Sequence, residues 1–138
     1  MALGGERLDL SDVPGELRRA AAAALRSAGV AEGHLSVALV PASRIRELNR
    51  EHRGLDEPTD VLSFPIDDTG SVAGPRELGD VFICPEHATN IDEATVHGVL
   101  HLCGYDHETD RGEMMQLQAE AIRSLGDRGP AAAGGQTA

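Results

Sequence analysis

The chain has 138 residues, a net charge of −11 and a pI near 4.8, and 41% of its residues are apolar. This length corresponds to one ordinary domain, and the charge argues against wide, sequence-indifferent binding of nucleic acid, which depends on neutralising phosphates. No apolar run approaches the length of a bilayer span, and residues 1–10 lack the order of a signal peptide. We therefore expect a cytoplasmic protein with no membrane partner.

The first third of the chain predicts a strand, a helix and a second strand. Residues 7–10 alternate weakly as a strand, and Ser11 and Asp12 are candidate caps for a helix that ends at Gly29. Residues 35–40 form a short apolar strand that the following proline breaks.

A second helix is predicted from Ser43, as its cap, to about His52. One stripe of this helix is expected to pack, and it comprises Ile45, Leu48 and His52. A second stripe is expected to point outward, and it comprises Arg46, Arg50 and Arg53. The window from Ser43 to Arg53 holds four arginines against two glutamates, which makes it the expected local excess of positive charge.

The second half predicts two strands and two helices. Residues 61–66 and 78–83 are expected to form an antiparallel hairpin with a long loop. A helix follows from Asp92 or Thr95 to about Cys103, and residues 114–125 are amphipathic.

The order βαβαββ followed by helices indicates an α/β (α+β) fold with a mixed four-stranded sheet and packed helices. We expect one domain over residues 1–126 and a disordered tail over 127–138, which is small, polar and rich in glycine. The two cysteines, Cys84 and Cys103, are expected to be unpaired buried thiols.

Three histidines occur in the segment HGVLHLCGYDH. His97 and His101 are four residues apart on one helix face, a separation that lets both imidazoles reach one metal ion. Gly104 permits a turn that can bring back His107 as a third ligand. Three nitrogen ligands with an open fourth position are typical of a catalytic zinc site, although imidazole also suits copper, nickel and iron.

The same spacing occurs in metzincin proteases, where a glutamate follows the first histidine. Here Gly98 holds that position. Because such proteases use the glutamate as general base, peptide hydrolysis is disfavoured.

Three blocks of the sequence resemble the signature blocks of the YbeY family of bacterial rRNA maturation endoribonucleases. They are VHGVLHLCGYDH (96–107), LNREHRGLDEPTDVLSFP (48–65) and ELGDVFICP (77–85), in the order of that family. The resemblance implies a mixed α/β fold, one zinc per chain on His97, His101 and His107, and cleavage of single-stranded RNA. It also implies a role in maturing the 3′ end of small-subunit rRNA and in ribosome quality control.

The resemblance places the functionally important arginine of the family on Arg53, whose guanidinium suits a phosphodiester. Arg46 and Arg50 are weaker candidates for guiding RNA. The stretch 85–95 is shorter than the family usually has, and Cys103 stands where an aliphatic residue is usual. Asp106 is interpreted either as an acidic turn residue or as a base or partner of a ligand histidine. We interpret the other histidines and nearby carboxylates as structural or solvent-facing; they are His34, His52, His87, Asp60 and Asp80.

Two other functions stay open on the sequence. One is a metal-dependent hydrolase of peptides or small molecules, and the other is a non-catalytic ribosome-assembly factor stabilised by zinc. The acidic charge favours help from a protein partner on the small subunit, such as a ribosomal protein or an assembly GTPase.

Overall fold

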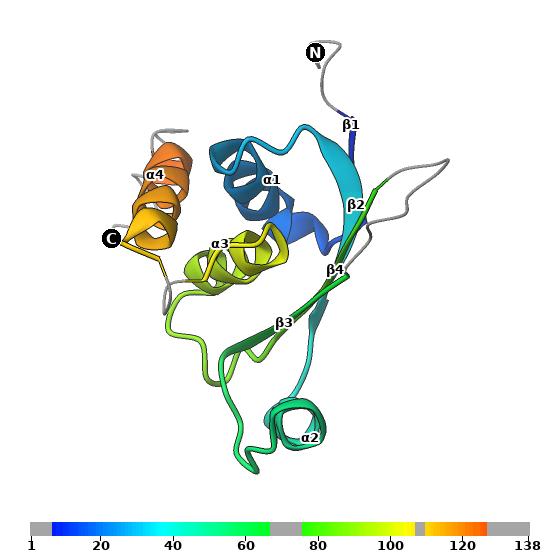
Figure 1. Ribbon diagram of the computed structural model, residues 1–138. Helices are drawn as coiled ribbons and strands as arrows, with labels where there is room; N and C mark the ends of the chain where they lie inside the picture. The colour runs from blue at the N-terminus through cyan, green and yellow to red at the C-terminus, as the bar shows by residue number, and fades with distance from the viewer. Residues whose placement is uncertain (1–6, 67–75, 107–109, 127–138) are drawn as a thin grey trace.

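A computed structural model describes residues 7–66, 76–106 and 110–126. Its elements follow the predicted order (Figure 1): β1 (Arg7–Asp12), the short 3₁₀ helix η1 (Gly15–Leu17), α1 (Arg18–Ser27), β2 (Glu32–Leu39), α2 (Ala42–Arg53), β3 (Val61–Pro65), β4 (Glu77–Ile83), α3 (Ile91–Leu102) and α4 (Glu113–Gly126). All four predicted strands and all four predicted helices are confirmed. The predicted tail, 127–138, lies outside the described residues.

The four strands form one mixed sheet in the order β1-β2-β4-β3. β1 and β4 both run parallel to β2, which lies between them. β3 runs antiparallel to β4, with Ser63 opposite Val81, so the predicted antiparallel hairpin is confirmed. β3 is therefore an edge strand of the sheet.

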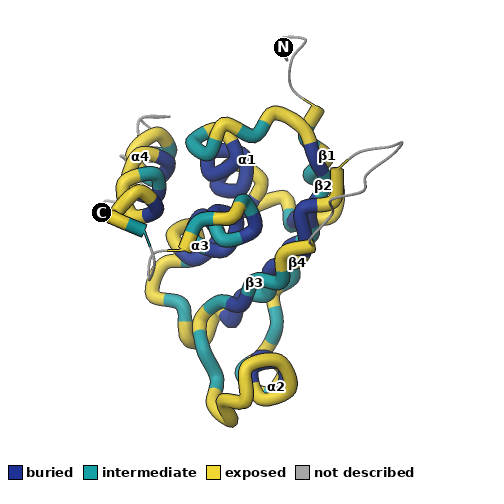
Figure 2. Tube along the Cα trace, viewed as in Figure 1, coloured by how far each residue is buried: buried dark blue, intermediate teal, exposed yellow. Residues whose placement is uncertain are grey.

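The helices α1, α3 and α4 gather on one side of the sheet (Figure 1). Alternation along β2 turns Gly33, Leu35 and Val37 inward, and all three are buried. Figure 2 shows the inner sides of α1 and α3 as buried surface against this face. The largest fully buried side chains of this layer include Leu17, Leu25, Leu35, Leu78, Leu100 and Met114.

The helix α2 packs on the other face of the sheet, near one end. Ile45 and Leu48 form a small buried cluster with Leu62 and Cys84. Leu62 alternates along β3 with Ser63, whose hydroxyl donates to the Gly98 carbonyl of α3. β3 is thus held between α2 and α3, and both helices approach its edge.

The predicted cap at Ser11 and Asp12 is wrong, because β1 extends through Asp12 and η1 begins only after Pro14. The Ser11 amide and hydroxyl both donate to Asp9 Oδ1, at 3.0 and 2.6 Å. Asp12 Oδ2 instead lies 2.6 Å from His34 Nε2 on β2. Contacts within the sheet therefore occupy the side chains that would have capped a helix.

The predicted cap at Ser43 is also wrong. α2 begins at Ala42, and the preceding Pro41 offers no side-chain cap. The Ala42 amide donates instead to Glu86 Oε1, at 3.1 Å, from the turn after β4. A carboxylate distant in sequence therefore satisfies an amide at the start of α2, where we expected a local hydroxyl to cap the helix.

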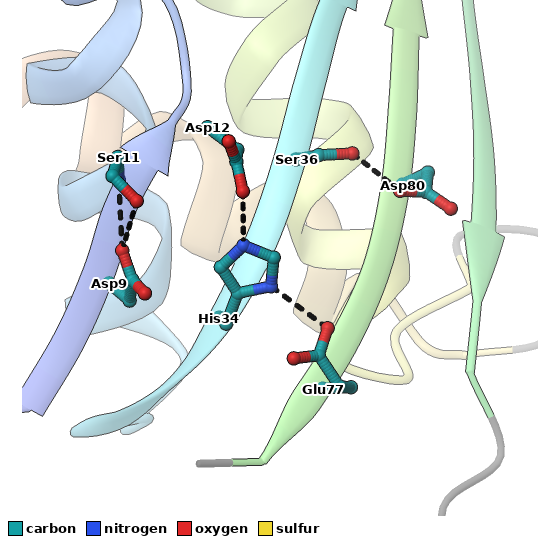
Figure 3. Close-up of polar contacts among 7 residues, drawn as sticks. All are labelled: Asp9, Ser11, Asp12, His34, Ser36, Glu77 and Asp80. Carbon is teal, nitrogen blue, oxygen red and sulfur yellow. Dashed lines mark hydrogen bonds and ion pairs between the residues drawn. The ribbon is translucent and has the colours of Figure 1, made fainter.

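Polar side chains cover the part of the outer sheet face that α2 leaves open (Figure 3). His34 lies between Asp12 and Glu77, with Nδ1 at 2.8 Å from Glu77 Oε1. The hydrogen bonds that the ring donates to Glu77 and, to a smaller extent, to Asp12 raise the pKa of His34 to about 9. Beside it, the Ser36 hydroxyl donates to Asp80. His34 is a structural histidine, as expected, because it joins β2 to Asp12 of β1 and to Glu77 of β4.

Both cysteines are free, as predicted, although Cys103 is only half-buried. Burial raises the pKa of the Cys103 thiol to about 11, which keeps it protonated and unreactive. Among the described residues, no helix has the length and apolar character needed to cross a bilayer.

Candidate active site

A cavity of about 570 Å³ lies beside the edge strand β3, where α2 and α3 come closest to it. Its walls come from three parts of the chain: the end of α2, the segment 59–65 that includes β3, and α3 with the residues just after it. The polar side chains on it are those of His52, Arg53, Thr59, Asp60, Ser63, His97, His101 and Asp106.

The two helical histidines come to this cavity because α3 forms as the sequence predicts, although it starts slightly earlier. Asn90 caps it, with Oδ1 accepting from the Glu93 amide at 3.0 Å, and Glu93 suits the positive end of the helix. His97 and His101 then lie one turn apart, with ring centroids 4.8 Å from each other. Both are half-buried on the cavity wall. The predicted pairing of these imidazoles on one face is confirmed.

Gln118 of α4 orients one of the two rings. Its Oε1 lies 2.9 Å from His97 Nδ1, and Gln118 itself is buried. Because an amide oxygen only accepts, this contact is a hydrogen bond in the tautomer that carries its hydrogen on Nδ1, and in that tautomer Nε2 has the lone pair that a metal ion needs. A metal-binding histidine is commonly held by such an outer partner. Gln118 was not among the predicted site residues, since nothing in the spacing of α4 distinguishes it from a solvent-facing glutamine.

The third predicted ligand, His107, lies outside the described residues. Gly104, which precedes it, has φ +100°, so the predicted turn after α3 is present. Within the described part of the chain, no three histidine, cysteine or acidic side chains are grouped to hold a metal. The paired imidazoles and the Gln118 contact fit a metal site of nitrogen ligands, and the complete set stays a prediction.

Arg53 is the last residue of α2, and Gly54 ends the helix in the left-handed conformation with φ 73°. The Arg53 side chain is exposed and lies on the cavity wall. The other two arginines of its stripe are tied to Asp56: Arg46 by two hydrogen bonds of 2.8 and 3.2 Å, and Arg50 at 3.8 Å. The outward direction of the stripe is confirmed, and Arg53 is its member on the cavity.

His52 differs from the prediction that placed it on the packed stripe. It is exposed, and its ring lies against Phe64 of β3 with centroids 4.8 Å apart. It also lines the cavity, as do Thr59 and Asp60, of which Asp60 was interpreted from the sequence as structural. Their position next to β3 could be recognised only once that strand proved to be the edge beside α3.

Gly98 does not face the cavity in the way that the protease comparison suggested. A Cβ atom there would lie 2.6 Å from Val81 Cγ1 and 3.0 Å from Val61 Cγ2, so this position faces the sheet. Glycine is needed for the close approach of α3 to β3 and β4. A glutamate at this position would therefore disturb packing, and it would not place a carboxylate beside the histidines.

Comparisons with known proteins agree with the fold and the sequence blocks. The family model described as Endoribonuclease YbeY matches residues 6–126. The Endoribonuclease YbeY of Nitrobacter hamburgensis is 39% identical over 123 residues, covering 76% of this chain and 65% of the relative. The Endoribonuclease YbeY of Anaeromyxobacter sp. is 43% identical, covering 80% of this chain and 64% of the relative. That of Bacillus cytotoxicus is 41% identical, covering 72% of this chain and 78% of the relative.

A solved structure supports the same relationship. The solution structure of TM1509 from Thermotoga maritima superposes with a TM-score of 0.52 at 26% identity, covering 88% of this chain and 89% of the other. The chain spans just under two thirds of the length of the first two relatives named above. Because the family model matches most of the chain and the curated relatives are about 40% identical to it over the aligned residues, this chain belongs to the YbeY family.

Proposed function

We propose that this protein is a zinc-dependent endoribonuclease that cleaves single-stranded RNA in rRNA processing. The proposed substrate is the 3′ end of small-subunit rRNA, with a further role in ribosome quality control. Partners on the small subunit, such as a ribosomal protein or an assembly GTPase, belong to the same proposal. The curated relatives are named endoribonucleases, which supports the reaction class.

One observation carries the proposal: Arg53 and the histidine pair, far apart in sequence, line the same cavity. A guanidinium can donate two parallel hydrogen bonds to phosphate oxygens, and imidazoles can hold a metal. A phosphodiester placed between them would meet both a cation and a Lewis-acid site. The ligands of this site are proposed to be His97, His101 and His107.

When bound there, zinc supplies Lewis acidity to a phosphate oxygen and acidifies a water molecule. The chain supplies the rest. Arg53 binds and orients the phosphate and stabilises the negative charge that develops as water adds to phosphorus and the leaving oxygen departs. Asp60 and Asp106 are the carboxylates on the cavity wall, and they are the candidates for accepting the proton of that water.

A peptide hydrolase is the second candidate because β3 is an edge strand on the cavity. The Ile66 amide donates to Leu78, and Asp60 accepts from Cys84. By alternation, the backbone groups of Val61 and Ser63 point away from β4, where an extended peptide could pair with them. The chain has Gly98 where metzincin proteases have their general-base glutamate, which argues against this activity. Because the two observations point in opposite directions, the assay includes peptide substrates.

The test combines metal analysis with single-turnover cleavage of single-stranded RNA and of peptides. Wild-type protein is expected to contain close to one zinc per chain and to cleave RNA only. Arg53→Ala should keep its zinc and its melting temperature while cleaving RNA at least about tenfold more slowly, a loss of ~1.4 kcal/mol of transition-state stabilisation. Arg53→Lys should recover part of the rate, since it keeps the charge without the planar fork.

The matched control is Arg50→Ala, which removes an arginine of the same stripe that is already bound to Asp56. It should cleave RNA at close to the wild-type rate. Wild-type cleavage by Arg53→Ala would remove Arg53 from the mechanism, and peptide turnover without RNA turnover would favour the second candidate.

A further inference from the structure

A second cavity, of about 560 Å³, lies between α1 and α4. Figure 1 shows these two helices side by side, at the opposite end of the molecule from α2. The polar and terminal residues that line it are Arg18, Arg19, Arg26, Ser27, Ser124 and Leu125, and together they define the α1–α4 groove. The groove has no residue in common with the candidate active site.

Two guanidinium groups of the groove are anchored by backbone carbonyls. Arg18 Nε donates to the Val13 carbonyl at 2.9 Å, and Arg19 Nη2 donates to the Leu125 carbonyl at 3.2 Å. Each bond uses one of the five N–H groups of an arginine and leaves the charge unneutralised. Within the described residues, neither side chain has a carboxylate at ion-pair distance, whereas Arg44 and Arg46 of α2 pair with Glu47 and Asp56.

The rest of the lining identifies the kind of ligand. Between the arginines lie Ala22 and Ala23, whose small side chains leave space along α1. Among the residues that the structure describes, the lining contains no aromatic ring on which a base could stack and no carboxylate that would repel a phosphate. The groove is therefore suited to negative charge on a backbone and not to the reading of bases.

Positive charge is scarce on this acidic chain, so a group of arginines in one groove stands out. Arg53 shares the active-site cavity with two acidic residues, Asp60 and Asp106. The chain as a whole carries −11. A positive excess was predicted at Ser43–Arg53, but ion pairs to Glu47 and Asp56 reduce it there. Among the described residues, Arg18 and Arg19 bond to backbone carbonyls and to no carboxylate.

We propose that the α1–α4 groove is a second RNA site, which binds backbone phosphates of the single-stranded substrate away from the point of cleavage. The inference rests on the proposed function. α4 connects the two places, because Gln118 contacts the active-site His97 and Leu125 lies seven residues further along the helix. At 1.5 Å per residue this separation is about 10 Å along the helix axis.

The test measures RNA affinity as a function of salt concentration with two oligonucleotides. One has about 5 nucleotides, near the lower end of the usual size of a single-strand site, and the other has about 20 nucleotides, which exceeds that size. The double variant Arg18→Ala/Arg19→Ala should bind the longer RNA at least about fivefold more weakly. The slope of log affinity against log salt should fall by about 1.4, because each phosphate that is no longer neutralised accounts for about 0.7. Affinity for the short RNA and its single-turnover cleavage should not change.

Two further variants separate charge from folding. Ser124→Glu keeps both arginines and their backbone bonds but adds a carboxylate to the groove, so it should weaken binding of the longer RNA in the same way. Arg7→Ala/Arg44→Ala removes the same charge from exposed positions outside both cavities and should behave as wild type.

Wild-type affinity and slope in both groove variants would overturn the second site and leave the proposed function intact. Loss of affinity in the double variant alone, with an unchanged salt slope and a lower melting temperature, would also overturn it, since the arginines would then act on the fold. If the wild type cleaves neither RNA but the groove variants still weaken binding, the proposed function fails and the second site stands. Absence of RNA binding by the wild type would overturn both.

Discussion

His34 and His97 show how the partners of a histidine decide its role. His34 lies between the carboxylates of Asp12 and Glu77, which raise its pKa to about 9 and hold it as a cation across three strands. His97 instead places Nδ1 against the neutral amide of Gln118 and lies on a cavity wall beside His101. The carboxylates make a structural ion pair, whereas the amide oxygen is the kind of outer partner that commonly orients a metal-binding histidine.

The largest expected effect is a difference in zinc content and RNA cleavage between the alanine variants of His97 and His34. His97→Ala should lose most of its zinc and at least about 100-fold of its RNA cleavage, more than the loss usual for a partner of a metal ligand. His34→Ala should keep its zinc and its rate of RNA cleavage but have a lower melting temperature. Zinc content, single-turnover cleavage and melting of the two variants test the comparison, which fails if His97→Ala retains full zinc.

Gln118→Leu tests the contact that distinguishes the two histidines. It removes the acceptor of His97 Nδ1 while keeping a side chain of similar size, and we expect zinc affinity to fall about 10–100-fold. Gln116→Leu is the matched control because Gln116 lies on the exposed side of the same helix. Competition with a zinc chelator measures both, and equal affinities would show that Gln118 does not position the ligand.

Gly98→Ala tests whether the histidine helix depends on its close approach to the sheet. The added methyl group would overlap Val81 Cγ1, so stability should fall by about 1–3 kcal/mol. Adding Val81→Ala to Gly98→Ala should restore part of the lost stability. The control is Gly15→Ala, which should change stability little because nothing lies within 4 Å of the added atom. Urea unfolding measures the series, and a fully stable Gly98→Ala would contradict the packing argument.

The smallest effect is the pH dependence that His34 confers. Its folded pKa is raised to about 9 from 6.5, so its contribution is fully present below pH 6.5 and is lost as the pH rises through about 9. Asp12, Glu77 and Asp9 are the charged groups that favour the protonated ring. Wild-type melting temperature should therefore decline across this window more than that of His34→Gln. Parallel curves would show that the ion pairs contribute nothing to stability.

Local sequence patterns were enough to predict the helices, the strands and the histidine pair. Apolar periodicity predicted each strand and helix, and the four-residue spacing of His97 and His101 required them to share a face once α3 formed. Both depend on neighbours along the chain, so local spacing contains the necessary information. The direction of Arg53 was predictable for the same reason.

Which groups distant in sequence meet could be seen only in the packed fold. The Ala42 amide is capped by Glu86, Asp12 is bound by His34, and Gln118 holds His97, although no local pattern marks these partners. Placing β3 at the sheet edge brought His52, Thr59 and Asp60 to the cavity. The docking of α1 against α4 likewise made a groove that includes three arginines of α1. These contacts depend on how the layers pack, and packing joins residues whose separation along the chain carries no periodic signal.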